Sequence, residues 1–138
     1  MKAISLWQPW ASLWVAGPKM HETRHWSTKH RGWLLVHAAK RIERDLDQQL
    51  LSLVVRLYGQ NWARILPTGA LLGSVKLWNC KLTEKTIPVD HDDRICGNWD
   101  PGRYAWRAVE FISWDVPIPF RGRQGLFEVP MVRRNDSS

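Results

Sequence analysis

A chain of 138 residues, 44% of them hydrophobic and 24% charged, has the size and composition of one globular domain with a substantial core. Its apolar runs are all shorter than the about 20 residues that span a membrane, and its two cysteines are too few for a disulfide framework, so we expect a protein of the reducing cytoplasm with no membrane partner. The net charge of +7 favours a polyanionic partner, and nucleic acid is the first class to consider.

The N-terminal part of the chain predicts a strand, a helix and a second strand. Lys2–Leu6 alternates enough for a short strand. Gln8–Ala16 carries a helical apolar pattern, with Pro9 in its first turn and Gly17 as its stop. Alternation over Met20–Trp26 then predicts a strand with two different faces, which hold His21, Thr23 and His25 on one side and Glu22, Arg24 and Trp26 on the other.

The rest of the chain predicts one long helix and several more strands. The run GWLLVHAAK, which follows a turn at Arg31-Gly32, is typical of a buried strand. Apolar residues recur at three- and four-residue steps from about Ile42 to Tyr58, which predicts a helix that Gly59 ends. Beyond it we expect a strand at 71–81 with a bend or bulge at Gly73, a long loop at 84–104, a long strand at 104–118, a closing strand within 120–132, and a flexible tail at 133–138.

These elements predict an α+β fold. There are about five or six strands and at least two helices, and the strands are mostly separated by other elements. We expect a small curved sheet or β-barrel flanked by the helices rather than a doubly wound sheet. The sequence shows neither an internal repeat nor a linker-like tract, so residues 1–132 are expected to form a single domain.

The positive charge is concentrated in two stretches. Six Lys and Arg residues and four histidines lie between Lys19 and Arg41, with Glu22 as the only acid. Residues 84–100 are net acidic. The second basic group follows them and consists of Arg103, Arg107, Arg121, Arg123, Arg133 and Arg134. Clusters of this kind attract nucleic acid because neutralised phosphates release counterions, although a basic surface that only aids solubility is the alternative.

Several short motifs occur in a fixed order along nearly the whole chain. The first half carries Gln8-Pro9-Trp10-Ala11, Gly17-Pro18-Lys19, Glu22-Thr23-Arg24, Arg31-Gly32 and, at the end of the apolar strand, Lys40. The second half carries GALLGSVKLWNC, then YAW at the start of the long strand, then a Gly-x-Gln-Gly turn from Gly122 to Gly125. Together these motifs resemble the ASCH domain family, and the resemblance spans roughly residues 3–130.

The resemblance implies a PUA-like fold, in which a small β-barrel flanked by helices has a cleft beside its first helix. Relatives of this fold bind RNA or DNA, often in a pocket that takes an extruded base. One ASCH branch hydrolyses acylated cytidines such as N4-acetylcytidine, and other members are reported as ribonucleases. We therefore expect binding of RNA or another single strand, with two alternatives: a hydrolase of a modified nucleoside or of RNA, and a protein-interaction module of the coactivator type.

The expected cleft is built from the segment between Gln8 and Arg24. Trp10 offers a face for stacking a base, Gln8 offers a donor and an acceptor for a base edge, and Arg24 can form a fork with a phosphate. The further residues expected to bind nucleic acid are Arg31, Lys40, Arg121 and Arg123. The alternatives are that Trp10 packs in the core, that Arg24 only pairs with Glu22, and that Arg121 and Arg123 lie in a solvated turn.

Lys19 and Glu22 are the candidate catalytic residues. A lysine partly removed from water can serve as base or nucleophile, although a neighbouring glutamate favours its charged form. The resemblance implies that the lysine of the deacylating branch works with a threonine three positions on and with a glutamate of the later polar segment. Here Glu22 stands at the threonine position, and the candidates for the third member are Glu84, Asp90, Asp92 and Asp93. Catalysis and a binding or structural salt bridge therefore both stay open.

No metal and no cofactor is expected. Cys80, His91 and Cys96 lack the spacing of a zinc site, and the glycines are too scattered for a phosphate-binding loop. His37, inside the apolar strand, is expected to be a core histidine.

Overall fold

The computed structural model describes residues 1–86 and 88–130, so the predicted tail at 133–138, and residues 131–132 of the predicted domain, lie outside the described residues. The described chain forms six strands and four α-helices. The strands are β1 (Lys2–Gln8), β2 (His21–Arg24), β3 (Gly32–Ile42), β4 (Ala70–Leu82), β5 (Tyr104–Pro119) and β6 (Leu126–Glu128). The helices are α1 (Trp10–Ala16), α2 (Gln48–Tyr58), α3 (Trp62–Ile65) and α4 (His91–Ile95), with a 3-10 turn, η1, at Thr83–Lys85.

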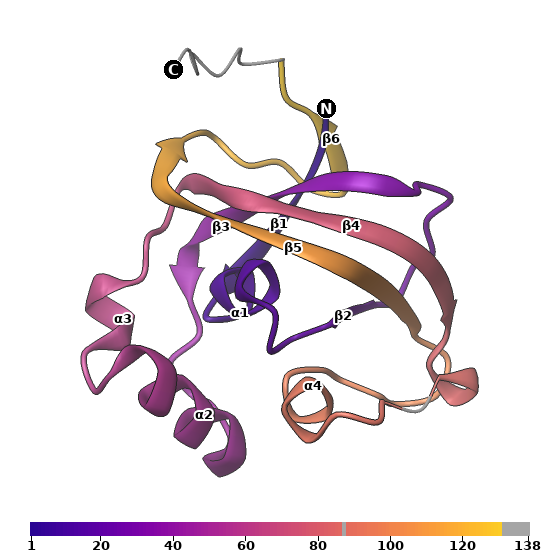
Figure 1. The fold of residues 1–138 in the computed structure, drawn as a ribbon, viewed down its shortest axis with the longest axis horizontal. Coiled ribbons are helices and arrows are strands. Elements are labelled where there is room, and N and C mark those ends of the chain that lie inside the picture. The colour runs from indigo at the N-terminus through magenta and orange to yellow at the C-terminus, as the bar shows by residue number, and fades with distance from the viewer. Residues whose placement is uncertain (87, 131–138) are drawn as a thin grey trace.

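All six strands belong to one curved sheet in the order β2-β5-β4-β3-β1-β6 (Figure 1). β1 and β3 are parallel, and the other neighbours are antiparallel. The predicted α+β class is confirmed, but the predicted closure into a barrel is wrong for the described residues, because β2 and β6 are free edges. Both edge strands are short: β2 pairs only with Tyr104–Arg107, and β6 pairs only with Lys2–Ile4.

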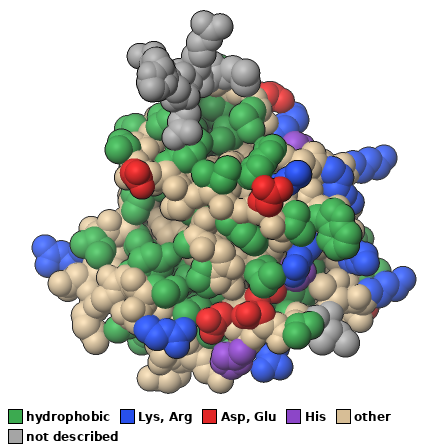
Figure 2. Space-filling view, viewed as in Figure 1, with side chains coloured by type: hydrophobic (Ala, Val, Ile, Leu, Met, Phe, Trp, Pro, Cys, Tyr) green, Lys and Arg blue, Asp and Glu red, His purple; other side chains and the backbone are tan. Residues whose placement is uncertain are grey.

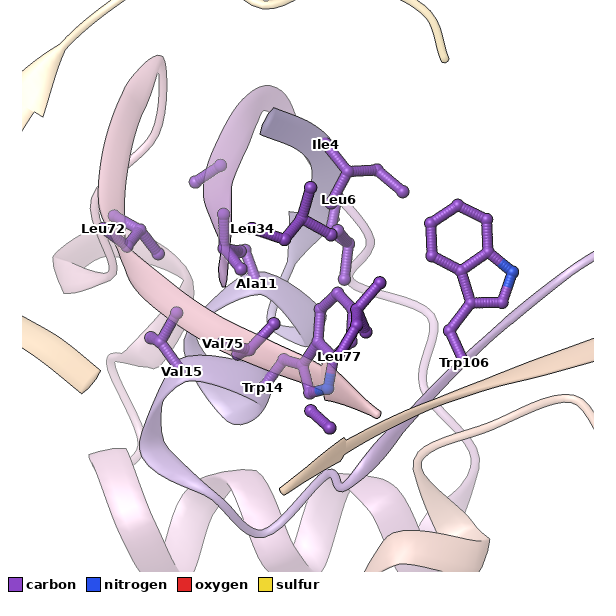
Figure 3. Close-up of a cluster of buried hydrophobic side chains, with 13 residues drawn as sticks. Ile4, Leu6, Ala11, Trp14, Val15, Leu34, Leu72, Val75, Leu77 and Trp106 are labelled. Atoms are coloured by element: carbon purple, nitrogen blue, oxygen red, sulfur yellow. The ribbon is translucent and has the colours of Figure 1, made fainter. Parts of the chain in front are cut away.

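Helix α1 lies between the sheet and the other helices (Figure 1). Its Trp14 packs in a buried cluster with Val75 of β4 and Trp106 of β5 (Figure 3). Its Leu13 packs on the opposite side, in a second cluster with α2 and α3. A fully buried side chain of this size contributes about 1.5–3 kcal/mol. Since α1 is held on both sides, the position of the chain at Lys19, just after it, is also fixed.

The parallel pairing of β1 with β3 moves two predicted boundaries. Gln8 pairs with Ile42, so Gln8 ends β1 instead of starting the first helix, and Ile42 ends β3 instead of starting the second. Helix α2 begins six residues later, where the Asp47 carboxylate accepts a hydrogen bond of 2.9 Å from the Leu50 amide. The helical periodicity was misleading because Ile42 and Leu46 pack, without being helical, on the same cluster as α2.

Two short helices were missed in the sequence. α3 has four residues and α4 has five, which is too short for a recognisable period. α4 lies within the stretch predicted as a long loop, and it starts where the Asp90 carboxylate accepts a hydrogen bond of 3.2 Å from the Asp93 amide. No helix in the described ranges is long and apolar enough to cross a membrane.

Three irregularities shape the β4–β5 hairpin. The predicted bend at Gly73 is confirmed by a register shift between Leu71 and Gly73. A second shift leaves Val109 without a partner position in β4, and a third leaves Trp78 without one in β5. These two residues are the extra residues of β-bulges, which turn a side chain away from the regular alternation, and both are exposed.

Replacement of Gly73 by alanine is expected to lower the free energy of unfolding by about 1–3 kcal/mol, because an added Cβ would lie 2.0 Å from the Ile112 carbonyl oxygen. Urea denaturation of Gly73→Ala measures this cost. Gly102→Ala is the control: Gly102 has a positive φ of +85°, but its Cβ would meet open space. A Gly73 variant no less stable than the Gly102 variant would contradict the steric explanation.

Candidate nucleic-acid interface

Two cavities lie along the gap between β1 and β2. The first, which we call the α1 cavity, has a volume of about 680 Å³ and includes Trp10, Glu22 and Asn98 in its lining. The second, which we call the arginine cavity, has a volume of about 1230 Å³; its cationic lining residues are Arg24, Lys40, Arg121 and Arg123. The two cavities share the lining residues Ser5, Trp7, Arg24 and His25, so they form one groove.

The Glu22 carboxylate connects the groups around this gap. Its Oε1 lies 2.7 Å from the Lys19 Nζ, and its Oε2 accepts a hydrogen bond from the Arg24 Nε. The same guanidinium donates through Nη2 to the Ser5 carbonyl oxygen at 3.0 Å. Arg24 of β2 therefore reaches β1 with its side chain at a place where the described residues show no ladder between the two strands.

Lys19 is buried beneath the groove. Only 1% of its side chain is exposed; its Nζ also donates to the His21 carbonyl oxygen and lies 5.2 Å from the centre of the Trp14 ring. Its backbone amide donates to Leu13 in the last turn of α1 at 3.2 Å. Glu22 lines the α1 cavity, whereas Lys19 is not among the lining residues of either cavity. The structure thus brings the two candidate catalytic residues together but exposes only the glutamate.

The surroundings of Glu22 keep it ionised. Burial raises its pKa. The positive charges of Lys19 and Arg24 and their hydrogen bonds lower it by a larger amount, so the pKa of Glu22 lies below its ordinary value of 4.5. At neutral pH this side chain is a carboxylate with two cationic partners.

Gln8 and Trp10 have different positions. Gln8 is fully buried; its Nε2 donates to the Ser12 hydroxyl at 2.7 Å and to the Pro67 carbonyl at 2.8 Å, and its Oε1 accepts from the Ser12 amide at 3.0 Å. It ties the start of α1 in place and lines neither cavity. Trp10 contacts both buried clusters and also lines the α1 cavity. One part of its side chain therefore packs against the core, and another part is open to a ligand in the cavity.

The arginine cavity is uniformly basic. None of the described residues that line it is an aspartate or a glutamate. Four of the predicted binding residues, Arg24, Lys40, Arg121 and Arg123, meet there although they come from three distant parts of the chain. Arg31 lies elsewhere: its Nη1 donates to the carbonyls of Thr28 and His30 at the turn before β3.

Two tryptophans of the arginine cavity were not identified in the sequence. Trp7 is 43% exposed, and the Arg41 guanidinium carbon lies 4.0 Å from the centre of its ring. Trp26 is half-buried and packs edge to face on Trp106, with the ring centres 4.7 Å apart. The alternation of β1 could have revealed Trp7, because its neighbours Leu6 and Gln8 point into the protein.

His37 holds the loop that carries Arg121 and Arg123. Its Nε2 donates to the Phe120 carbonyl at 2.6 Å; because a carbonyl only accepts, Nδ1 is the acceptor for the Ser5 hydroxyl, 2.9 Å away. Burial lowers the pKa of His37, and the bond to Phe120 offsets part of this effect. Gly122 fits against the ring so closely that an added Cβ would lie 2.5 Å from Cε1. His37 is thus buried, as predicted, and it positions the arginine loop.

The four acids proposed as a third catalytic member are engaged away from Lys19 and Glu22. The Glu84 carboxylate accepts from the Gly102 amide at 2.9 Å, Asp90 caps α4, and Asp92 lies 3.5 Å from Arg56. Asp93 is buried on the other face of β2. Its Oδ2 lies 2.7 Å from the His21 Nδ1, and its Oδ1 accepts from the amides of Met20 and His21.

Asp93 therefore fastens the 84–100 segment to β2. Burial raises its pKa, but the hydrogen bonds and charge of His21, together with the backbone amides, lower it below the ordinary value. Over the described part of the chain, no group of three or more His, Cys, Asp or Glu side chains is placed to hold a metal ion.

Comparison with known proteins identifies relatives of this chain. The family model for the ASCH domain matches residues 4–117. Activating signal cointegrator 1 of Homo sapiens is 38% identical over 93 residues, and that of Mus musculus is 39% identical over 93 residues; each match covers 65% of this chain and only 16% of the relative. The crystal structure of a mutant form of the ZmASCH protein from Zymomonas mobilis superposes with a TM-score of 0.56 at 13% identity, over 93% of this chain and 88% of that one, which supports the fold alone.

Replacement of Glu22 by glutamine is expected to lower the free energy of unfolding by about 3 kcal/mol at neutral pH, because it leaves the buried Lys19 ammonium without its counter-ion. Since the pKa of Glu22 is lower in the folded state, its stabilisation is present above pH 4.5 and is lost as the pH falls below that value. The difference between wild type and Glu22→Gln should therefore narrow on acidification, as measured by urea denaturation at several pH values.

The matched control is Glu110→Gln, which removes an exposed ion pair in which the carboxylate lies 3.2 Å from the Lys76 Nζ. It should lower the free energy of unfolding by less than about 1 kcal/mol. Equal effects of the two substitutions would show that the Glu22 contacts contribute little to stability. A difference between wild type and Glu22→Gln that is independent of pH would show that the ionised carboxylate is not its source.

Proposed function

The chain belongs to the ASCH domain family, and we propose that it binds single-stranded nucleic acid, RNA in preference, in the groove formed by the α1 cavity and the arginine cavity. The observation that carries the proposal is the lining of the arginine cavity, where four cationic side chains meet and no carboxylate is among the described lining residues; of the four, Arg24 is paired with Glu22. Phosphates are the ligands that such a lining favours. RNA is preferred because the ASCH domain is associated with RNA binding.

The aromatic residues favour a single strand over a duplex. Trp7 and Trp26 lie beside the cations of the arginine cavity, and Trp10 lies in the α1 cavity. Stacking of an unpaired base on such a ring is worth about 1–3 kcal/mol, and bases within a duplex are not free to make this contact. A groove that alternates cations with indole rings suits a strand whose bases are splayed out.

The two cavities have different roles in this proposal. The α1 cavity is mixed in charge, since Glu22 and Asp47 line it together with Arg24 and Arg103, so it suits a base better than a phosphate. Asn98, which also lines it, offers its side-chain NH2 group as a donor to a base, while its Oδ1 accepts from the Asp100 amide at 3.0 Å. The arginine cavity takes the adjoining phosphates. Arg24 lines both cavities and contacts the nucleotide at the junction.

Lys19 and Glu22 position Arg24 in this proposal and do not carry out hydrolysis. A general base works best when its pKa lies near the operating pH, whereas the pKa of Glu22 is lowered by two cations. The Lys19 ammonium is buried under the glutamate, away from the lining of the α1 cavity. The hydrolase of acylated cytidine and the ribonuclease are therefore the less favoured uses of the same groove.

A protein-interaction module is the remaining alternative. The named relatives are activating signal cointegrators, and this chain spans about a sixth of their length, with 16% covered. Salt distinguishes the two kinds of partner, because binding to phosphates weakens steeply as the salt concentration rises and an apolar protein interface does not weaken in this way.

The double variant Arg121→Ala/Arg123→Ala is expected to bind an unstructured RNA oligomer more weakly and with a shallower salt dependence. Each lost phosphate contact on a single strand should reduce the slope of log K against log salt by about 0.7. Fluorescence anisotropy of a labelled oligomer at four or five salt concentrations measures both quantities. Arg56→Ala, which removes an exposed arginine on α2 that lines neither cavity of the groove, is the control and should leave the slope unchanged.

The same incubations, followed by mass spectrometry, test the catalytic alternatives. RNA and N4-acetylcytidine should both remain intact with the wild type. Free cytidine or shortened RNA that is formed by the wild type and not by Lys19→Ala would overturn the assignment of Lys19 to positioning. Wild-type protein that does not bind RNA at low salt would overturn the proposed function itself.

Replacement of Gly122 by alanine is expected to weaken RNA binding although it removes no charge. The added Cβ would collide with the His37 ring, so the loop must move and carry Arg121 and Arg123 with it. The same anisotropy titration should show a loss close to that of the double arginine variant, and little further loss when Gly122→Ala is added to that variant. Gly59→Ala, whose Cβ would meet open space and which lines neither cavity, is the control; equal affinity of wild type and Gly122→Ala would refute a fixed loop.

A further inference from the structure

A second surface that combines cations with an exposed indole lies on the other side of the 84–100 segment from the groove. Asn79 and Lys81 of β4 and Arg107 of β5 share one face of the sheet, because Asn79 pairs with Arg107 and the intervening Cys80 and Trp106 pack on the core. Lys85 comes from η1 beside them. On the face shown in Figure 2, Lys and Arg side chains gather with hydrophobic ones on the right, over this end of the hairpin.

Trp78 is placed on this surface by a β-bulge. Leu77 pairs with Ala108 and Asn79 pairs with Arg107, so Trp78 is the extra residue between them. Its side chain is 65% exposed, although burial of an indole is normally favourable by several kcal/mol. Bulges often re-aim a side chain next to a functional site. An exposed tryptophan at a bulge is therefore a reason to look for a ligand.

A cavity of about 580 Å³ lies at this place. Its lining includes Trp78, Lys81, Lys85, Arg107, His21 and the two acids Asp90 and Asp93. The Asp90 carboxylate accepts from the Asp93 amide at 3.2 Å. The carboxylate of Asp93 is already occupied by His21 and two backbone amides. None of the ion pairs found among the described residues involves Lys81, Lys85 or Arg107. The cavity thus presents three uncommitted cations next to an indole ring.

We propose that this cavity, the Trp78 site, binds a nucleotide, with its base on Trp78 and its phosphate toward Lys81, Lys85 and Arg107. The nucleotide is either part of the strand that occupies the groove, a case that rests on the proposed function, or a free mononucleotide. Thr23 lines the α1 cavity and His21 lines the Trp78 site, and alternate residues of a strand lie about 7 Å apart. Because Asp93 and Asn98 bind the 84–100 segment to β2 between the two sites, a strand that occupies both must pass over that segment.

The test compares Trp78→Ala with wild type on three probes: an RNA oligomer of about five nucleotides, one of about fifteen, and adenosine monophosphate. If the Trp78 site extends the groove, the variant should bind the longer RNA at least about fivefold more weakly, the cost of one lost stacking contact, and the shorter RNA equally well. Trp78→Phe should restore most of the affinity. Because Trp78 is exposed, both variants should keep the wild-type melting temperature.

The two sources of the nucleotide give different results. Saturable binding of adenosine monophosphate by wild type, lost in Trp78→Ala and in Lys81→Ala/Lys85→Ala, with RNA affinity unchanged, would assign the site to free nucleotides. Equal affinity of wild type and Trp78→Ala for all three probes would overturn the proposal. Failure of wild type to bind either RNA would count against the groove, and the mononucleotide titration would then decide the Trp78 site independently.

Discussion

The carboxylate of Glu22 is the contact on which the groove depends. It accepts from the buried Lys19 ammonium on one side and from the Arg24 guanidinium on the other, and Arg24 continues to the Ser5 carbonyl of β1. One acid thereby joins the end of α1, the edge strand β2 and the strand across the gap. Because a side chain spans this gap where a ladder of backbone hydrogen bonds would have closed it, the sheet stays open and the two cavities have room to form.

Several acidic side chains of the chain are bonded within the fold, whereas several basic side chains face the groove. The net acidic segment at 84–100 presents fewer free carboxylates than its composition suggests, since Glu84 and Asp90 bind backbone amides and Asp93 is buried on His21. Among the cations that line the arginine cavity, Arg24 is paired with Glu22, whereas none of the ion pairs found among the described residues involves Lys40, Arg121 or Arg123. The formal charge of +7 therefore understates how basic the groove is, because part of the compensating negative charge is engaged within the fold.

Much of this arrangement could be predicted from the sequence, and the failures have physical causes. The alternation of β2 correctly separated Glu22 and Arg24 from His21, since period-2 patterns follow directly from strand geometry. The start of α2 was predicted too early because Ile42 packs on the same cluster as the helix. An apolar pattern shows which residues are buried together, and a buried residue need not be helical. Gln8 looked like a ligand-binding residue because sequence shows which bonds an amide can make but not that Ser12 and Pro67 already make them.

The bulges at Val109 and Trp78 lie on opposite strands of one hairpin, and their effects cancel. Each adds one residue to its own strand, so β4 and β5 have the same register immediately before and after the pair. Because neither residue has a partner, deletion of either one leaves the other pairs of the hairpin in place and restores the regular alternation of buried and exposed side chains in its own strand. The two insertions are therefore independent of each other in their effect on pairing, and the surface indole is an addition to the hairpin that the core beneath it does not require.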